Sequence, residues 1–445
     1  MNIGLLHFRV GETDGVSLEM EKWKLMLEEL GHKVWYIAGS GDIEDVIYIK
    51  ELHYQNPTND LLVNHIYKRL PDQYSEDEIR NILDAYTQDI YKSLVEVIQK
   101  YEIDLLIPNN VLSLGWNIAA GKATSQAIEA TGIKAIAHHH DFHWERELYS
   151  NPRYTWVTDI LETYFPPVFD KLRHVVINNI AQKALKDKKN LESLIVPNVF
   201  DYEQNWMVTD DYNKTIRLDL GLDEQDIIIL QATRIVARKG IELTIRAIKH
   251  MSEQLKSMED QVLYNGNVIT KDTKIKLVFV GLNEDIPYYN KLSELGDELG
   301  ITMVYLGDRF DFDRKEVKGK KIFSLWDAYC LADIVSYPSL LEGFGNQLLE
   351  AVYAKKPMMI YEYPVYESYL KEFGLSSISY GNQHSLDAVG LANVPEGVLA
   401  KAAQEALACI TDPEIYKEMV DKNYKICLKE FSYQTLKELL RNLVH

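Results

Sequence analysis

Two glutamates stand eight positions apart around a glycine-bearing turn in the second half of the chain. Glu342 opens the turn, Gly343 and Gly345 lie within it, and Glu350 follows shortly after. A short apolar strand is predicted before the turn and an amphipathic helix after it, so free N–H groups at the helix start can bind an anion. Carboxylates accept hydrogen bonds from hydroxyls. The turn therefore suits a ligand with phosphate in its middle and hydroxyls at both ends, such as a nucleotide sugar. The alternative interpretation is two solvated glutamates.

Two cations, Arg234 and Lys239, flank a second turn, which follows the apolar stretch 227–232. The pattern again predicts a strand before the turn and a helix after it. Paired cations at such a place fit a diphosphate leaving group, whose growing negative charge they would stabilise in the transition state. As isolated surface cations they would carry no function. Arg238 is predicted to be exposed, and this interpretation does not require it.

Three consecutive histidines, His138, His139 and His140, follow a strand predicted over 134–137. They are candidates for a metal site, for buried hydrogen-bonded residues, or for a polar group beside a bound ligand. A metal site is disfavoured because side chains of an extended segment alternate between two faces, which leaves only His138 and His140 able to converge. The other two interpretations stay open on the residues alone.

Strands and helices in alternation must position these residues. Apolar segments typical of buried strands alternate with helical patterns in both halves of the chain, which predicts α/β domains with doubly wound parallel sheets. The predicted strands are 3–7, 33–38, 103–108, 134–137, 174–178 and 194–197 in the first half and 227–232, 275–281, 303–307, 333–337 and 357–361 in the second. Helices are predicted over 17–30 and 75–100, the latter begun by Ser75 and Glu78 at capping-box spacing. Ligands of such sheets bind beyond the carboxyl ends of the strands, where the candidate residues fall.

Size and composition indicate a globular protein of two domains. The chain has 445 residues, more than one ordinary domain, with 46% hydrophobic and 26% charged residues. Its net charge of −19 argues against nucleic acid and anionic lipid as partners. No apolar run is long enough to span a membrane and no signal peptide is evident, so the sequence predicts a cytoplasmic protein without an integral membrane segment.

The segment 338–351, P-S-x-x-E-G-F-G-x-x-x-L-E-A, resembles the E-x7-E signature of retaining GT-B glycosyltransferases of glycosyltransferase family four. R-x4-K-G at 234–240 is similar to the pyrophosphate clamp of that family. The resemblance implies an α/β fold of GT-B type, with two Rossmann-like doubly wound parallel-sheet domains facing a cleft. It assigns Glu342 to the donor sugar and Glu350 to the nucleotide ribose. The donor-binding residues that it implies are Gly15, Arg234, Lys239, Gly281, Gly343, Phe344, Gly345, Asn346 and Glu350.

The family also carries a histidine that contacts the transferred sugar, and a glycine-bearing loop after its first strand. His140 is the best match for the histidine, with His139 and His138 as alternatives, and Gly11–Gly15 resembles the loop. The implied catalytic residues are His140, Arg234, Lys239 and Glu342. The residues expected to bind the acceptor are Asp14, Asp141 and Arg146.

The two series of strands and helices set the expected domain boundaries. Residues 1–200 are predicted to form an N-terminal acceptor-binding domain and 201–224 a linker. Residues 225–430 are predicted to form a C-terminal nucleotide-sugar-binding domain, and 431–445 a helix that crosses back to the N-terminal domain.

The resemblance implies a retaining hexosyltransferase. Its donor would be a nucleotide-diphosphate sugar, UDP-glucose or GDP-mannose, and its acceptor a soluble sugar, sugar phosphate or hydroxy acid. Transfer to a lipid-linked or polymeric glycan, or a PLP-dependent sugar phosphorylase of similar fold, are the alternatives. No cofactor and no metal are expected. Asp311-Phe-Asp313 formally matches a metal-binding D-x-D motif but is expected to lie in a polar loop. A homo-oligomer is left open, and nucleic acid is not an expected partner.

Overall fold

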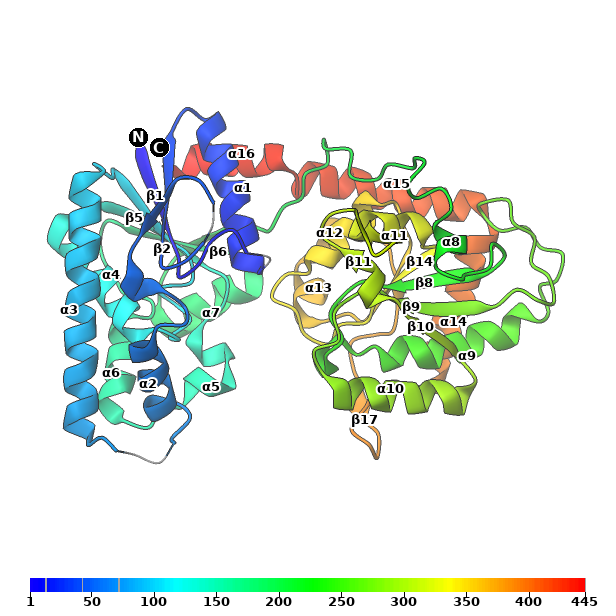
Figure 1. Cartoon of the computed structure of the whole chain (residues 1–445), viewed down its shortest axis with the longest axis horizontal. Helices are drawn as coiled ribbons and strands as arrows, with labels where there is room; N and C mark the ends of the chain where they lie inside the picture. The colour runs from blue at the N-terminus through cyan, green and yellow to red at the C-terminus, as the bar shows by residue number, and fades with distance from the viewer. Residues whose placement is uncertain (13, 42, 71–72, 445) are drawn as a thin grey trace. The chain divides into compact units, whose positions relative to one another are not determined.

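A computed structural model describes residues 1–12, 14–41, 43–70 and 73–444 (Figure 1). Thr13, which falls in the predicted loop Gly11–Gly15, lies outside the described residues. The chain divides into two compact units. Unit 1 consists of Met1–Val199 with Tyr433–His445, and unit 2 of Phe200–Ser432. Residues 201–224, the predicted linker, belong to unit 2 and include the short helix α8 (Ile216–Asp219).

Unit 1 is built, within the described residues, on a seven-stranded sheet in which every pairing is parallel. The strand order is β3-β2-β1-β4-β5-β6-β7. The strands are β1 (Asn2–Leu6), β2 (Lys33–Ala38), β3 (Val46–Tyr48), β4 (Leu105–Pro108), β5 (Lys134–His139), β6 (Leu172–Val176) and β7 (Ser193–Ile195). The chain turns back through the sheet between β1 and β4, so the loops after these two strands begin side by side.

Helices cover both faces of this sheet, because successive strand residues point to opposite sides. Leu5 and Ile107 pack in one core cluster with α1 and α16, whereas Leu6 and Leu106 pack in another with α3 and α4. The helical segments are α1 (Gly15–Glu29), η1 (Lys50–Leu52), α2 (Pro57–Ile66), α3 (Glu76–Lys100), α4 (Ile118–Thr131), η2 (His143–Glu145), α5 (Glu147–Ser150), α6 (Thr155–Tyr164), α7 (Asn179–Lys189) and α16 (Tyr433–Val444). The predicted capping box at Ser75 is confirmed, since Ser75 and Glu78 bond each other's backbone N–H groups.

Unit 2 repeats the plan with a six-stranded parallel sheet in the part of the chain that the structure describes. Its order is β10-β9-β8-β14-β15-β16, so the chain turns back between β8 and β14. The strands are β8 (Ile227–Gln231), β9 (Ile275–Phe279), β10 (Thr302–Tyr305), β14 (Ile334–Tyr337), β15 (Met358–Ile360) and β16 (Ile378–Ser379). The strands predicted in both halves are confirmed, 33–38 with the predicted ends and the others with shifted ends. The short strands β3 and β16 of these sheets were not predicted.

Helices and the small hairpin of β17 and β18 surround the unit-2 sheet (Figure 1). The remaining segments are η3 (Ala237–Lys239), α9 (Glu242–Leu255), α10 (Ile286–Leu299), η4 (Gly307–Arg309), α11 (Leu325–Leu331), α12 (Asn346–Tyr353), α13 (Pro364–Ser368), η5 (Leu370–Phe373), β17 (Ser385–Leu386), β18 (Ala392–Asn393), α14 (Glu396–Thr411) and α15 (Pro413–Glu430). None of the described helices combines the length and the apolar composition that a membrane span needs.

The prediction of a polar loop around Asp311-Phe-Asp313 is wrong for part of this segment, because Asp311 lies in a strand. Residues 310–324 form a small three-stranded sheet from β11 (Phe310–Asp311), β12 (Lys315–Val317) and β13 (Lys320–Ser324). Arg314 anchors it through ion pairs with Asp210 and with the buried carboxylate of Asp327. These short strands are rich in charged side chains and lack the alternation of apolar and polar residues that predicts a strand from sequence.

Candidate active site

The loops after β8 and β14 bring a lysine and a glutamate together at the carboxyl edge of the unit-2 sheet. Lys239 ends the turn η3 after β8, and Glu342 lies in the loop after β14; their side chains form an ion pair. These strands are neighbours at the point where the chain reverses through the sheet. Ligands of doubly wound sheets bind at such points. Lys239 and Glu342, separated by about 100 residues in sequence, thus lie where a ligand of unit 2 is expected.

Glu342 is held by two cations. Its second oxygen lies 3.0 Å from Nη1 of Arg238, which also donates to the Leu341 carbonyl at 3.1 Å. The side chains of Lys239 and Glu342 are 9% and 12% exposed, so water screens their pairing little. Burial by itself would raise the pKa of Glu342, but the charges of Lys239 and Arg238 outweigh it and hold that pKa below its usual value. Glu342 is therefore an anion poised to bond hydroxyls.

Arg234 points to a different partner. Its Nη1 lies 2.8 and 3.2 Å from the two carboxylate oxygens of Glu284, in the loop after β9, and both side chains are well exposed. Arg234 and Lys239 share one turn but do not share a partner. Arg238, to which no role was assigned from the sequence, binds Glu342 although it is exposed as predicted. Its place next to Lys239 was the only sequence signal available.

Glycines shape the loop between β14 and α12. Gly345 precedes the first residue of α12 with φ of 122°, a conformation that side chains rarely adopt, and a Cβ there would overlap the Tyr363 hydroxyl. The same hydroxyl donates to the Phe344 carbonyl at 2.6 Å, and Phe344 itself is buried. Gly343 is exposed, and Asn346 begins α12. The loop is thereby fixed with one exposed glycine just before a helix N-terminus, an arrangement suited to binding an anion.

Glu350 and Gly281 have structural partners at the same edge. Glu350 lies in α12 and accepts a hydrogen bond of 2.9 Å from the buried hydroxyl of Tyr329, which keeps its carboxylate in place. Gly281 follows β9, and a Cβ at this position would overlap the backbone carbonyl of Thr233. Close packing against the turn after β8 is thus one reason for glycine at position 281.

Polar residues gather at the carboxyl edge of the unit-1 sheet, around Asn110. The Asn110 side-chain oxygen accepts from the backbone N–H groups of His140 and Asp141 at 2.7 and 3.0 Å. Asp141 in turn pairs with Arg146 at 2.8 Å. Asn110 follows β4 in the left-handed conformation, with φ of 59°. It thus ties the loop after β4 to the loop after β5, a role that was not predicted although Asn110 lies two residues after an apolar strand.

The three histidines have different environments. The strand β5 extends two residues further than predicted and includes His138 and His139, which are both buried. His138 stacks on Trp23 and donates from Nδ1 to the side-chain oxygen of Asn109 at 3.0 Å, whereas His139 bonds His174 at 3.0 Å. These two histidines match the interpretation as buried, hydrogen-bonded residues.

His140 lies just past the strand and is partly exposed. Its Nε2 atom has no hydrogen-bond partner among the described residues. Burial lowers the pKa of His140 to about 4, against the opposing charge of Asp141. The ring is therefore neutral near pH 7 and can offer one hydrogen bond without adding charge.

Asp14 and Gly15 open the helix α1 rather than lying in a loop. The predicted helix over 17–30 starts two residues earlier, because Asp14 caps it by accepting from the N–H groups of Val16 and Ser17 at 3.1 and 3.2 Å. Arg9 also contacts Asp14, at 3.1 Å. A Cβ added at Gly15 would have no atom of the described residues within 4 Å of it. The helix start at the end of β1 is thus accessible at Gly15.

The candidate metal ligands of the sequence are the histidines at 138–140 and the D-x-D motif of Asp311 and Asp313. No three His, Cys, Asp or Glu side chains in the described ranges are grouped to hold a metal ion, and Asp311 pairs with Lys315.

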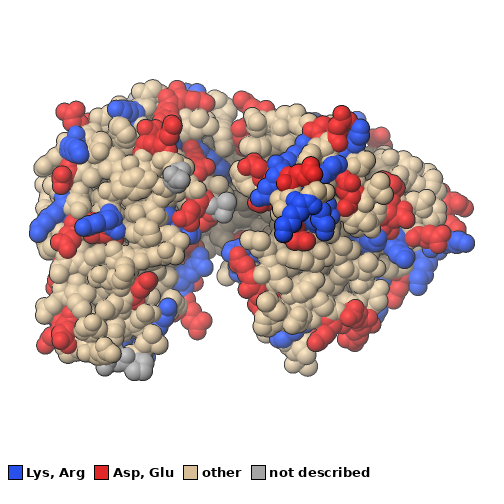
Figure 2. Space-filling model, viewed as in Figure 1, with Lys and Arg blue, Asp and Glu red and all other residues tan. Residues whose placement is uncertain are grey.

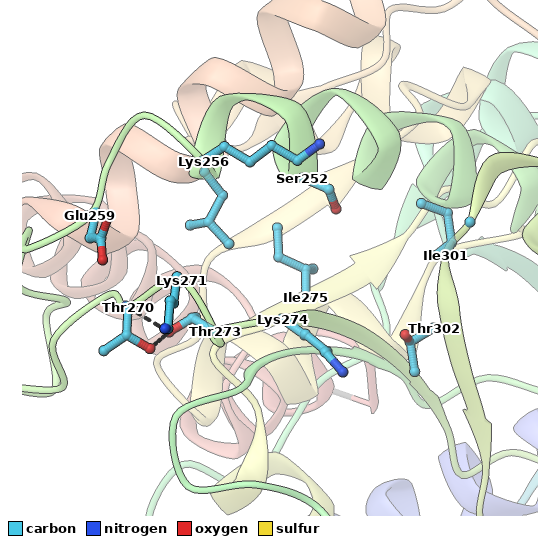
Figure 3. A pocket seen from close by; sticks show the side chains of 12 residues that line it. Ser252, Lys256, Glu259, Thr270, Lys271, Thr273, Lys274, Ile275, Ile301 and Thr302 are labelled. Atoms are coloured by element: carbon cyan, nitrogen blue, oxygen red, sulfur yellow. Dashed lines mark hydrogen bonds between the residues drawn. The ribbon is translucent and has the colours of Figure 1, made fainter.

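A hollow of about 390 Å³ lies at the amino edge of the unit-2 sheet, where α9 and α10 end (Figure 3). Lys256 and Lys274 line it and offset the negative ends of those helices. On the face shown in Figure 2, acidic and basic side chains are interspersed.

Comparisons with known proteins agree with this geometry. The model of the family described as glycosyl transferases group 1 matches residues 213–386. Among solved structures, a glycosyltransferase of Rickettsia africae aligns over 99% of this chain and 97% of its own, with a TM-score of 0.64 and 13% identity. Sucrose-phosphate synthase of Thermosynechococcus elongatus aligns over 100% and 98%, with a TM-score of 0.58 and 14% identity. The fold is of the GT-B type, and the protein is a glycosyltransferase that uses a nucleotide-sugar donor.

Two relatives define the family more closely. The chain is 41% identical over 414 residues to mannosylglucosylglycerate synthase of Petrotoga mobilis, covering 93% of this chain and 94% of that protein. It is 37% identical over 440 residues to mannosylglucosylglycerate synthase of Thermotoga maritima, covering 99% of each. The chain belongs to the same family of glycosyltransferases as these two synthases.

Proposed function

We propose that this protein is a retaining mannosyltransferase that forms mannosylglucosylglycerate by moving mannose from GDP-mannose to a hydroxyl of glucosylglycerate. The observation that carries the proposal is the identity of 41% and 37% to two synthases named for this product, over nearly the whole chain. Mannose is the outermost unit in that name, which favours GDP-mannose over UDP-glucose as donor. Glucosylglycerate is both a sugar and a hydroxy acid, the acceptor class expected from the sequence.

Unit 2 is proposed to bind the donor. In this proposal Glu342 accepts hydrogen bonds from the sugar hydroxyls and Glu350 from the ribose. Lys239 and Arg234 neutralise the diphosphate, and Arg234 exchanges its surface contact with Glu284 for a phosphate oxygen. The exposure of both Arg234 and Glu284 supports the exchange, because a solvated pair is worth about 1 kcal/mol or less. The exposed Gly343 and the start of α12 supply N–H groups to the phosphates.

The proposed reaction keeps the anomeric configuration. The acceptor hydroxyl attacks the anomeric carbon, the bond from that carbon to the diphosphate oxygen breaks, and the hydroxyl proton leaves with the diphosphate. Rate enhancement comes from holding both substrates in position and from cations that stabilise charge on the leaving diphosphate. This mechanism needs no resident metal, since Lys239 and Arg234 supply the positive charge.

Unit 1 is proposed to bind the acceptor. Arg146 and Asp141, joined to each other at 2.8 Å, offer a cation for the glycerate carboxylate and an acceptor for a hydroxyl. His140 is the proposed contact to the transferred sugar, which fits its neutral ring and its Nε2 atom without a partner among the described residues. Asp14 and Gly15, at the start of α1, complete the proposed set. Asp14 already caps the helix, so its part in binding is the least direct.

The test is synthesis in solution. The protein is incubated with GDP-mannose or UDP-glucose and glucosylglycerate, and products are identified by mass spectrometry. The one-bond carbon–hydrogen coupling at the new anomeric centre gives the configuration. We expect a mannosyl product with the configuration of the donor. An inverted product would overturn the retaining mechanism. Transfer only to lipid-linked or polymeric acceptors, or phosphorolysis with an absorbing PLP Schiff base, would overturn the proposed function.

A further inference from the structure

A chain of buried hydroxyl and amide groups crosses unit 2 and ends at Thr233. Tyr380 lies 3.1 Å from the Thr244 hydroxyl, which lies 2.8 Å from that of Ser336. Ser336 lies 2.6 Å from the side-chain oxygen of Gln231, whose nitrogen lies 2.6 Å from the Thr233 hydroxyl. The other four members of this series are at most 1% exposed: Tyr380, Thr244, Ser336 and Gln231. Gln231, Ser336 and Thr244 lie in β8, β14 and α9, and Tyr380 directly follows β16, so the contacts depend on the tertiary fold.

The direction of these hydrogen bonds is fixed by the far end of the chain. The Tyr380 hydroxyl is buried, and within the described residues it bonds Thr244, so Tyr380 donates and Thr244 accepts. Thr244 then donates to Ser336, and Ser336 to the oxygen of Gln231. The opposite direction would leave one buried hydroxyl proton, that of Tyr380 or that of Thr244, without an acceptor among the described residues, which costs about 1–3 kcal/mol.

The Thr233 hydroxyl is therefore an acceptor toward the interior. The Gln231 amide nitrogen can only donate, so the Thr233 proton must point elsewhere. Within the described residues its acceptor is the adjacent Arg234 carbonyl at 3.3 Å, a long contact. Thr233 is partly exposed and lies in the turn that also carries Arg234 and Lys239. The proton is thus available at the carboxyl edge of β8.

We propose that Thr233 donates a hydrogen bond to a phosphate oxygen of the nucleotide-sugar donor, and that the chain from Tyr380 to Gln231 keeps this hydroxyl in the donating state. The inference rests on the proposed function for the position of the diphosphate. A diphosphate offers oxygens that accept hydrogen bonds, so a hydroxyl held as a donor matches it and one held as an acceptor does not. Tyr380 is a positioning residue, since it acts through three other side chains.

The experiment measures GDP and UDP binding by calorimetry, in parallel with melting temperature and donor kinetics. Thr233→Val removes the hydroxyl at nearly equal volume and should weaken binding of the nucleoside diphosphate about tenfold or more, as for loss of a bond to a charged group. Thr233→Ser should stay within about threefold of wild type. Tyr380→Phe removes the hydrogen bond that holds and polarises Thr244 at the far end of the series, and should weaken binding about threefold.

A matched control separates positioning from packing. Tyr366→Phe removes another buried tyrosine hydroxyl of unit 2. This hydroxyl bonds Ser377 at 2.9 Å and takes no part in the series of hydrogen bonds from Tyr380 to Thr233. It should lower the melting temperature about as much as Tyr380→Phe while leaving nucleotide affinity unchanged. Equal affinities of wild type and Thr233→Val, or equal effects of the two tyrosine variants, would overturn the inference. So would a wild type that binds neither nucleotide. Binding without transfer to glucosylglycerate would overturn only the proposed function.

Discussion

Replacing Lys239 by methionine tests the site most directly. Methionine keeps most of the side-chain volume but removes the ammonium group that pairs with Glu342. If Lys239 stabilises the leaving diphosphate, kcat/KM for the donor should fall about 100-fold or more, the usual loss when one contact to transition-state charge is removed. A 100-fold loss corresponds to about 2.7 kcal/mol of transition-state stabilisation.

The same change should also cost stability. Breaking a buried ion pair by removing one partner costs about 3–5 kcal/mol. Arg238 remains 3.0 Å from Glu342, but its side chain is 43% exposed, so it offsets at most about 1 kcal/mol. We therefore expect the free energy of unfolding to fall by about 2–4 kcal/mol. Urea unfolding measures this loss, and initial rates taken well below the melting temperature measure the kinetic loss separately.

Arg238→Met is the matched control. It removes a cation from the same carboxylate, but an exposed one, so we expect a loss of less than about 1 kcal/mol in stability and less than about tenfold in kcat/KM. Near-normal kinetics in Lys239→Met would refute the assignment of this lysine to the diphosphate. Equal kinetic losses in both variants would show that neighbouring charge in general, and not Lys239, supports the reaction.

Three further predictions concern the glycine loop, the histidines and metal. Gly345→Ala should lower the free energy of unfolding by about 2–4 kcal/mol in urea, because φ of 122° is strained for alanine and the new methyl meets Tyr363; a change under about 0.5 kcal/mol contradicts this. Burial lowers the pKa of His7, His140 and His174 to about 4, so the unfolded state binds more protons below pH 6.5. The free energy of unfolding should be highest above pH 6.5 and fall toward pH 4 by up to about 1.4 kcal/mol per pH unit for each of these histidines. A free energy of unfolding that stays constant over this pH range would contradict the prediction. EDTA should leave the transfer rate unchanged, and a loss restored by Mg²⁺ or Mn²⁺ would contradict a metal-free mechanism.

The sheets and the position of Glu342 could be predicted because their signals are local. Continuous apolar strands such as 227–232 are bounded by turns, and a residue just after such a strand must lie at the carboxyl edge of a parallel sheet. The same reasoning placed Lys239 and His140 at their edges. The helix over 75–100 was equally clear, because its capping box and its apolar period agree.

Pairings between distant segments could not be predicted. Arg238 pairs with a carboxylate 104 positions away and Arg234 with one 50 positions away. A single sequence holds no signal that links two such distant residues as partners. The small sheet at 310–324 was missed because its charged two- to five-residue strands are held by Arg314 and its distant partners. The hydrogen bonds of Asp14 to the start of α1 were also not predicted, because this helix begins two residues earlier than its apolar pattern indicated.

The helix α16 sets an order in which the chain can fold during synthesis. Leu436, Leu440 and Leu443 of α16 pack in the same core cluster as Met20 and Trp23 of α1, so unit 1 buries this face only with a segment made more than 230 residues after Val199. Unit 2 is continuous in sequence and can fold on the ribosome as soon as it emerges. Unit 1 must wait with part of one apolar face uncovered, where α16 will pack beside α1. Chaperones that bind nascent apolar segments are thus expected to associate with residues 1–199 until α16 has left the ribosome.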